Sequence, residues 1–464
     1  MAATRRRSMT APRMLALGAA LALGASPAVA ETIDSALARA YGGNPTLNAQ
    51  RAGVRAVDEN VAQAKSGYRP TVSGVADVGV AYRSGQFSGT ASSVEQTLAP
   101  RSAGLQVNQT IFNGYQTDNR VRQAESQVIG ARETLRNAEM STLFSGAQAY
   151  MNVLRDTATL ELQRNNVEVL EEQLRQTRDR FNVGEVTRTD VAQAEARLAG
   201  ARSQASLAES NLRSSIAVYR QVVGVEPRQL APGRPLDRFV PPSLDTAIAI
   251  GLKEHPQILS ALHAVDVAET QVKVFEGALA PQLGLTGAVT QAYDQQFANT
   301  QSLSASIVAR LTVPIYEGGL VYSQIRQAKE TSGQRRIEAE TTRDAVRAAV
   351  VASWGQLEAA KAQVIASQAQ VQANEVALNG VREEARVGQR TTLDVLNAQQ
   401  ELLTSRVNLI LAQRDRVVSS YSVVQSVGRL TTRFLNLNVA QYSAKEHFDQ
   451  VKDLWFGART PDGR

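Results

Sequence analysis

The 464-residue sequence has no cysteine, two tryptophans and three histidines, and only 5% of its residues are aromatic. The absence of cysteine excludes disulfides, thiolate metal sites, catalytic thiols and a lipid-modified N-terminal cysteine. The histidines, His255, His263 and His447, show no metal-ligand clustering, so we expect each to be structural. Nucleophile-elbow, phosphate-loop and paired-carboxylate motifs are also missing. We therefore expect neither an enzyme nor a cofactor-binding protein.

Long apolar runs are missing as well, except near the start of the chain. Residues 1–30 have the pattern of a secretory signal peptide, with a positive start, an apolar run from Met14 to Gly24 and the small residues Ala28-Val29-Ala30 before the expected cleavage site. This apolar run is too short for a stop-transfer helix. A retained anchor is the alternative. We expect the mature chain to begin near Glu31 and to work outside the cytoplasm.

The chain carries little net charge for its length. Of the formal net charge of +6, four charges are arginines within residues 1–30, a stretch without acidic residues, so the remainder carries +2. A nearly neutral chain argues against a nucleic-acid partner. Its abundance of Ala, Gln, Arg, Val and Leu, with helical periodicity, instead favours long coiled-coil helices.

What the sequence does contain is an internal duplication. Pro45 and Pro70 recur 211 residues later as Pro256 and Pro281, whereas later landmarks such as Gly114 and Gly318 are 204 residues apart. The first copy therefore holds seven extra residues between Pro70 and Gly114. We predict a first repeat at residues 31–225, a linker at 226–242, a second repeat at 243–428 and a C-terminal tail at 429–464.

Each repeat has the same predicted order of elements. A helix at 46–67 or 257–277 is followed by two stretches of alternating apolar and polar residues, which are typical of strands with two different faces. The clearest alternation places Leu303, Ile307, Leu311, Val313 and Ile315 on one face and Ser304, Ser306 and Arg310 on the other. The first repeat shows the same alternation, with Leu105, Val107 and Ile111 against Gln106, Asn108 and Thr110. The partner strands are expected at 71–82 and 282–293, and polar loops at 83–100 and 294–301. These strands are long enough to cross a bilayer when they are tilted relative to its normal.

A long helix and a return helix complete each repeat. Residues 117–182 and 322–386 contain no proline, and helices of that length extend on the order of 100 Å. Apolar residues of the return helices recur with heptad spacing, as in Leu396, Leu403 and Ile410, which predicts supercoiled packing.

A short motif joins the helices of each repeat. Val183-Gly184 and Val387-Gly388 end the long helices, because glycine tolerates a positive φ. Thr-x-x-Asp segments that end at Asp190 and Asp394 start the return helices by capping their free N–H groups. We therefore predict two helical hairpins with similar tips.

Four strands with one apolar face require an oligomer. They cannot close a barrel, and an open sheet edge is not tolerated in lipid. Two chains would supply eight strands and three would supply twelve. The barrel should have about the same cross-section as the long helical body that leads into it, and this favours three chains.

With these features the chain resembles the TolC-like outer membrane efflux proteins over nearly its whole mature length. The most specific parts are 180–184 with Thr189-Asp190-Val191, and Val387-Gly388 with Asp394-Val395-Leu396. The resemblance implies a mainly α, α+β fold, in which a homotrimer forms a twelve-stranded outer-membrane barrel continued by a periplasmic helical tunnel with a mixed equatorial belt. It places the linker 226–242 and residues 434–457 in that belt.

The resemblance also implies a function and its partners. The family passes substrates from an inner-membrane transporter, ABC-type or proton-driven, through a periplasmic adaptor and across the outer membrane of a Gram-negative bacterium. Residues 438–442 and 451–457 look like those of the branch that serves type I protein secretion. The outer membrane component of a multidrug efflux pump is the alternative, and a soluble periplasmic helical scaffold is a second one.

Family roles carry over to particular residues of the tips. Adaptor docking falls on Val183, Gly184, Val387, Gly388 and Gln389. In the family an arginine matching Arg390 bonds an aspartate matching Asp190 and holds the periplasmic entrance shut, while a gate tyrosine is replaced here by Ala385. An acidic ring at the entrance keeps Asp394, but Asn397 replaces its second aspartate. The alternatives are that both aspartates only cap helices and that Arg390 is a solvated surface charge.

Overall fold

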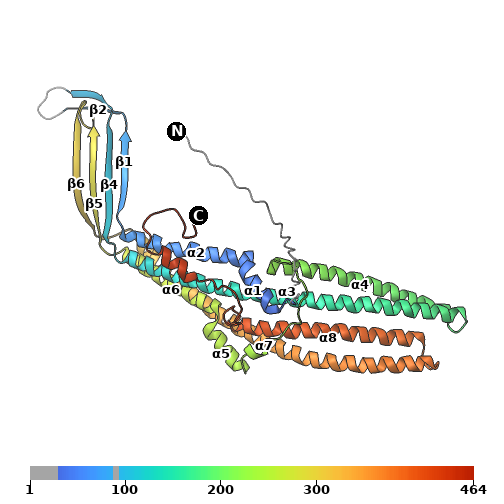
Figure 1. The fold of residues 1–464 in the computed structure, drawn as a ribbon. Coiled ribbons are helices and arrows are strands. Elements are labelled where there is room, and N and C mark those ends of the chain that lie inside the picture. Colours follow the sequence, from blue (N-terminus) through green and yellow to red (C-terminus); the bar gives the residue numbers. More distant parts are fainter. Residues whose placement is uncertain (1–29, 87–92, 464) are drawn as a thin grey trace, which may run out of the picture.

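A computed structural model describes residues 30–86 and 93–463 of the chain, and the predicted signal peptide lies outside this part except for Ala30. A sheet stands at one end of a long helical body (Figure 1). The described helices are α1 Ile33–Gly43, α2 Pro45–Lys65, α3 Gln116–Asn182, α4 Arg188–Val223, α5 Leu244–Glu254, α6 Pro256–Gly277, α7 Leu320–Arg386, α8 Thr392–Ser426 and α9 Ala444–Val451, with short 3-10 turns at Ser66–Tyr68 and Asp237–Phe239. None of these helices is long and apolar enough to cross a membrane.

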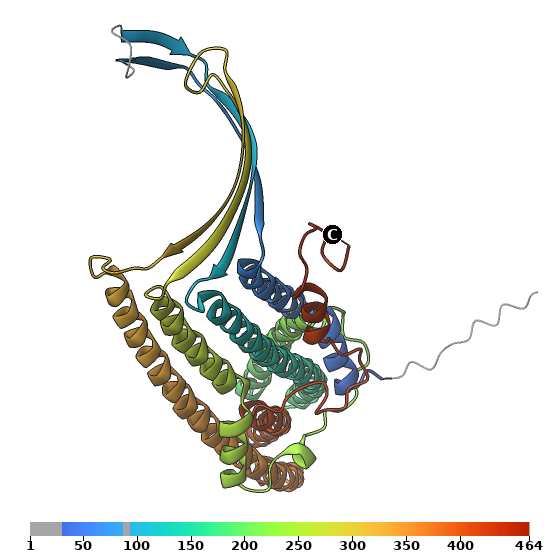
Figure 2. The same ribbon diagram turned by 90° about the vertical axis from the view of Figure 1, so that its left-hand side faces the viewer.

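The helices follow the predicted duplication. α3 and α7 have 67 residues each and begin and end within two residues of the predicted bounds. Each turns back into a shorter helix, α4 or α8, and the four helices α2, α3, α6 and α7 leave the sheet side by side (Figure 2). The sheet and the tips therefore lie at opposite ends of the helical body (Figure 1).

The sheet has four antiparallel strands in the order β1-β4-β5-β6. The strands are β1 Thr71–Val78, β4 Arg101–Phe112, β5 Gln282–Tyr293 and β6 Gln301–Thr312. The central pair joins the two repeats, since β4 pairs with β5 from Arg101 opposite Tyr293 to Phe112 opposite Leu283. β1 and β6, the outer strands, each belong to one repeat.

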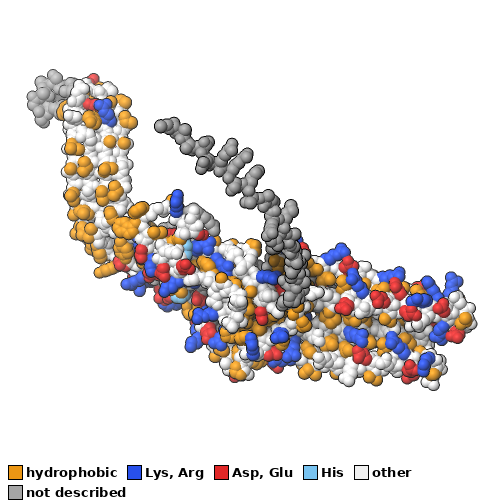
Figure 3. Space-filling model, viewed as in Figure 1, with side chains coloured by type: hydrophobic (Ala, Val, Ile, Leu, Met, Phe, Trp, Pro, Cys, Tyr) orange, Lys and Arg blue, Asp and Glu red, His pale blue; other side chains and the backbone are white. Residues whose placement is uncertain are grey.

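The register gives the sheet one apolar and one polar face, as the alternation predicts. Leu105 lies opposite Gly74 of β1 and Val289 of β5, and Val289 lies opposite Ala305 of β6. Leu303, Ile307 and Leu311 share this face and are 71%, 81% and 63% exposed. On the polar face, the Asn108 carboxamide oxygen accepts hydrogen bonds from Gln106 (3.0 Å) and from Thr286 (3.1 Å). Hydrophobic side chains gather on the sheet, whereas charged ones cover the helical body (Figure 3).

The predicted loop 83–100 is wrong in part. Strands β2 Ala81–Gln86 and β3 Ser93–Leu98 form a separate antiparallel ladder beyond the sheet. The ladder was missed because polar residues occupy both of its faces, so no alternation marks it. It accommodates the extra residues of the first repeat. In the second repeat β6 ends at Thr312, so Val313 and Ile315, expected on its apolar face, lie beyond it.

The largest apolar core surrounds the middle of the body. It joins α1 with α3 and with the chain that follows α8, through Leu37, Tyr150 and Leu430. A smaller cluster packs α5 on α7 around Ala247 and Val350. The linker contributes Leu230 and Leu236, and the tail contributes residues up to Ala444. Beyond Ala444 the tail leaves this core, and α9 lies along α2.

Candidate functional site: the hairpin tips

Both tips have the same backbone structure. Gly184 and Gly388 have φ of +82° and +81°, a conformation that glycine adopts without strain. The next residue in each tip closes the helix end, since Glu185 N–H donates to Arg180 C=O and Gln389 N–H donates to Glu384 C=O, both at 2.9 Å. Val183 and Val387 are 73% and 68% exposed. Each tip thus presents one valine on a rigid turn.

Capping boxes start both return helices. Thr187 Oγ1 accepts from Asp190 N–H, while Asp190 Oδ2 accepts from Thr187 N–H (2.9 Å). Thr391 and Asp394 repeat this arrangement. Each aspartate also accepts a hydrogen bond from the threonine hydroxyl, at 2.7 Å for Asp190 and 2.9 Å for Asp394. The hydroxyl and N–H of the threonine both donate to the carboxylate and favour its ionised form, so they hold the pKa of both aspartates below the ordinary value. Both aspartates therefore cap helices, which was the alternative to a role in the entrance.

An ion pair braces each tip, and the two pairs have opposite polarity. Arg180 at the end of α3 bonds Glu185 in the turn (3.0 Å), whereas Glu384 at the end of α7 bonds Arg390 in the turn (2.8 Å). Arg180 and Glu384 occupy equivalent repeat positions, 204 residues apart. The hydrogen bond to Glu384 raises the pKa of Arg390. The two tips share a backbone shape but differ in charge placement.

Two of the four predicted gate residues, Asp190 and Arg390, line one cavity. An open cavity of about 860 Å³ lies between the hairpins near their tips, and both Asp190 and Arg390 line it. Within the chain, however, Arg390 Nε donates to Glu384, and Asp190 is bonded to Thr187. The Asp190–Arg390 latch thus stays a prediction.

Asn397 joins the two hairpins. Arg197 of α4 donates a hydrogen bond to its carboxamide oxygen at 2.9 Å. The neighbouring Leu396 is buried in the first hairpin against Leu198 and other apolar residues of α3 and α4. An aspartate at position 397 would face the Arg197 guanidinium, so the neutral amide keeps the contact but not the negative charge.

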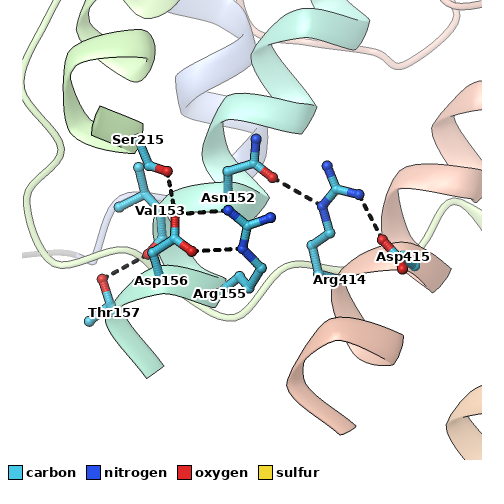
Figure 4. A network of polar contacts seen from close by, with 8 residues as sticks. All are labelled: Asn152, Val153, Arg155, Asp156, Thr157, Ser215, Arg414 and Asp415. Carbon is cyan, nitrogen blue, oxygen red and sulfur yellow. Dashed lines mark hydrogen bonds and ion pairs between the residues drawn. The ribbon is translucent and has the colours of Figure 1, made fainter. Parts of the chain in front are cut away.

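A second group of polar contacts between helices lies nearer to the middle of the helical body. Asp156 of α3 is bonded by Arg155 (2.7 and 2.9 Å) and by Ser215 of α4, and Arg414 of α8 donates to Asn152 of α3 at 3.0 Å (Figure 4). The first set holds the two helices of one hairpin together. The Arg414 bond connects the two hairpins.

Sequence reasoning located the tips but missed their charged partners. Arg180 belongs to the 180–184 motif, but the motif does not indicate that its side chain pairs with Glu185. Glu384 and Arg197 lie outside the glycine and threonine motifs, among many other charged residues of the helices. The repeat offered one usable signal, because Glu384 matches Arg180 at the helix ends. It could not show that Arg197 reaches Asn397 on another hairpin.

A sheet with one apolar and one polar face, connected to two long helical hairpins with similar tips, is the architecture of a membrane channel with a helical body. The sequence matches the family of outer membrane efflux proteins over residues 35–225 and 248–429. The chain belongs to this family, which confirms the resemblance, and it is an outer membrane protein that extends into the periplasm. Membership of a family of channels also agrees with the expectation that the chain is not an enzyme.

Relatives and solved structures cover most of the chain. It is 44% identical over 442 residues to the outer membrane efflux protein BepC of Brucella suis, with 94% of each chain covered. It is 25% identical to Escherichia coli TolC, covering 90% of this chain and 86% of TolC. The alkaline protease secretion protein AprF of Pseudomonas aeruginosa is 25% identical, with 74% and 72% covered.

The fold class is confirmed by structural similarity. The Campylobacter jejuni CmeC outer membrane channel superposes with a TM-score of 0.78 at 17% identity, covering 90% of this chain and 89% of that one. The mainly α architecture with a small sheet is therefore that of an outer membrane channel.

Proposed function

We propose that three copies of this chain form the exit duct of a tripartite export system. The observation that carries this proposal is the sheet, whose apolar face is exposed and whose outer strands β1 and β6 pair on one side only within the described residues. Edges of this kind must be closed in lipid. β1 and β6 run in opposite directions, so β6 of one copy can pair antiparallel with β1 of the next. Three copies then give twelve strands, within the range of outer membrane barrels.

The tips would dock a periplasmic adaptor. Val183 and Val387 are the exposed apolar side chains of two rigid turns, next to Gly184, Gly388 and Gln389. The turn of the first tip carries the acidic residue of its ion pair, Glu185, and the turn of the second tip carries the basic one, Arg390. An adaptor could distinguish the two tips by this difference in charge. The adaptor would connect the duct to an inner-membrane transporter.

Type I protein secretion is the favoured use of the duct. Similarity to a protease secretion protein supports it, together with the resemblance of residues 438–442 and 451–457 to the secretion branch. The efflux name of BepC supports drug efflux as the second candidate.

Cysteine cross-linking tests the barrel, because the chain has no cysteine of its own. Ser73 of β1 is changed to cysteine together with Ser302, Ser304 or Ser306 of β6, all on the polar face. We expect one pair to give disulfide-linked trimers in outer membranes. As a control, Ser102→Cys on the inner strand β4 replaces Ser73→Cys and should give no link between copies. Monomers with every β6 partner would refute the barrel.

A photo-reactive probe at Gln389 tests the docking site and the cargo class. Capture in cells of the adaptor of an ATP-driven exporter would support secretion, and capture of a proton-driven pump's adaptor would support drug efflux. A probe at Gln413, in the upper half of α8, serves as the control. Capture at Gln413 but not at Gln389 would contradict tip docking.

A further inference from the structure

The last part of the tail is tied to the base of the sheet. α9 contacts α2, and His447 Nδ1 lies 3.0 Å from the buried Asp58 carboxylate. We call residues 452–457 the tail segment. In it, Asp453 forms an ion pair with Lys65 (2.6 Å), and Leu454 C=O accepts a hydrogen bond from Arg69 (2.6 Å). These contacts carry the segment from the helical body to the residues that precede β1.

The tail segment is held in place with its apolar side chains exposed. Leu454, Trp455 and Phe456 are 48%, 68% and 92% exposed. The Arg69 guanidinium carbon lies 4.7 Å from the Trp455 ring centroid, which fixes one face of the indole. Three consecutive large apolar residues on a fixed surface indicate that something covers them.

The position of the segment indicates what covers it. Arg69 lies two residues before the first residue of β1, and the apolar face of the sheet begins there with Val72, which is 67% exposed. Ile315 and Tyr316, just after the end of β6 at the other edge of the sheet, are exposed as well. Hydrophobic side chains are densest in this zone (Figure 3). The tail segment therefore lies at the base of the sheet, beside the residues that lead into its exposed apolar face.

We propose that the tail segment is a membrane anchor, in which Trp455 and Phe456 insert into the periplasmic leaflet of the outer membrane. Trp is favoured at this depth because its ring is apolar and its N–H needs a polar partner. Lys65 and Arg69, beside the segment, would face lipid phosphates. The proposal rests on the proposed function only in requiring that the sheet crosses the bilayer.

The two tryptophans of the chain allow a direct test. Trp354→Phe leaves Trp455 as the single tryptophan, and Trp455→Phe leaves Trp354 as a matched control. Trp354 packs with the α5–α7 core, and its position in α7 is on the order of 50 Å from the start of that helix. Full-length protein of each variant is reconstituted into phosphatidylcholine–phosphatidylglycerol vesicles with or without brominated acyl chains.

We expect brominated lipid to quench most of the Trp455 emission and to leave the Trp354 emission unchanged. Unquenched Trp455 with a red-shifted spectrum would mean that the segment stays in water. Unquenched Trp455 with a blue-shifted spectrum would mean that protein, such as a second copy, covers it. Either result overturns the anchor.

Channel conductance of the same vesicles separates the two proposals. Conductance without Trp455 quenching rejects the anchor and keeps the duct. Absence of both conductance and strand insertion rejects the duct itself. As a second variant, Phe456→Ser combined with Trp354→Phe keeps Trp455 as the single reporter, and we expect it to reduce the quenching, because it removes apolar surface from the inserted segment.

Discussion

At the scale of single residues, the duplication places different side chains in one structural role. Asn44 and His255, 211 residues apart, each precede a proline and cap a helix. Asn44 Oδ1 accepts from Thr46 N–H (2.9 Å), and His255 Nδ1 accepts from Gln257 N–H (3.2 Å). Burial, followed by the nearby charge of Arg136, lowers the pKa of His255 to about 4. Only the neutral ring can act as this cap.

His255 should therefore make stability depend on pH. Between pH 6.5 and 4 the unfolded chain binds a proton at this histidine and the folded chain does not, so stability falls as the pH falls through this window. A shift of this size corresponds to up to about 3 kcal/mol. We expect His255→Asn, which copies the first repeat, to reduce the loss of melting temperature between pH 7.5 and 5. His263→Asn is the control, and equal losses in wild type and His255→Asn would contradict the assignment.

Asp394 combines a capping role with a proposed role at the entrance. Asp394→Asn keeps an oxygen that can accept from Thr391 N–H but removes one charge from each copy. We expect it to lower the cation selectivity of the reconstituted channel, because the negative ring attracts cations. Thr391→Ala should instead cost about 1 kcal/mol of stability and leave selectivity intact. An unchanged reversal potential in Asp394→Asn would refute the ring.

At the scale of elements, the junctions between sheet and helices differ between the repeats. Gly114 and Gly318 both have φ of +66°. A Cβ on Gly114 would lie 2.2 Å from Gly277 C=O, whereas a Cβ on Gly318 would meet no atom within 4 Å. The first junction is packed on the end of α6, and the second is open.

Alanine at the two glycines should separate strain from packing. We expect Gly318→Ala to cost only about 1–2 kcal/mol for the left-handed backbone. Gly114→Ala adds a clash with backbone, so we expect a larger loss of melting temperature and less protein in the outer membrane. Equal losses for both variants would show that the contact with Gly277 contributes nothing.

The helices and strands could be predicted from the sequence where a single local pattern determines them. The absence of proline and the Val-Gly stops gave α3 and α7 almost to their ends, and period-two alternation gave the faces of β4 and β6. The β2–β3 ladder has no apolar face and left no such pattern. Contacts between distant elements, such as Arg197 with Asn397 or Trp455 with Arg69, depend on packing geometry that no local pattern encodes.

At the scale of the whole molecule, the proposed entrance would be formed by the tips of three copies. Within one chain Arg390 braces its own tip through Glu384. The proposed latch to Asp190 is a different bond, which would form in the closed assembly and break on docking. The brace requires that Arg390 bonds Glu384, whereas the latch requires that it bonds Asp190.

Two substitutions distinguish the brace from the latch. Arg390→Ser removes both bonds, and we expect it to raise single-channel conductance. Glu384→Gln weakens the brace but keeps the arginine charge for Asp190, so its conductance should stay near that of wild type. Equal increases in both variants would assign the effect to the shape of the tip, and no change in Arg390→Ser would exclude the arginine as a gate.

The equal length of α3 and α7 has a consequence for how such proteins can change in evolution. Each helix has 67 residues, so the two repeats carry long helices of the same length from the sheet to the tip. An insertion of seven residues in each helix of a single hairpin would keep the heptad phase but move its tip forward by about 10 Å. The adaptor would then meet a stepped rim. Lengthening the helical body therefore requires matched insertions in all four helices, which are four coordinated changes in one gene.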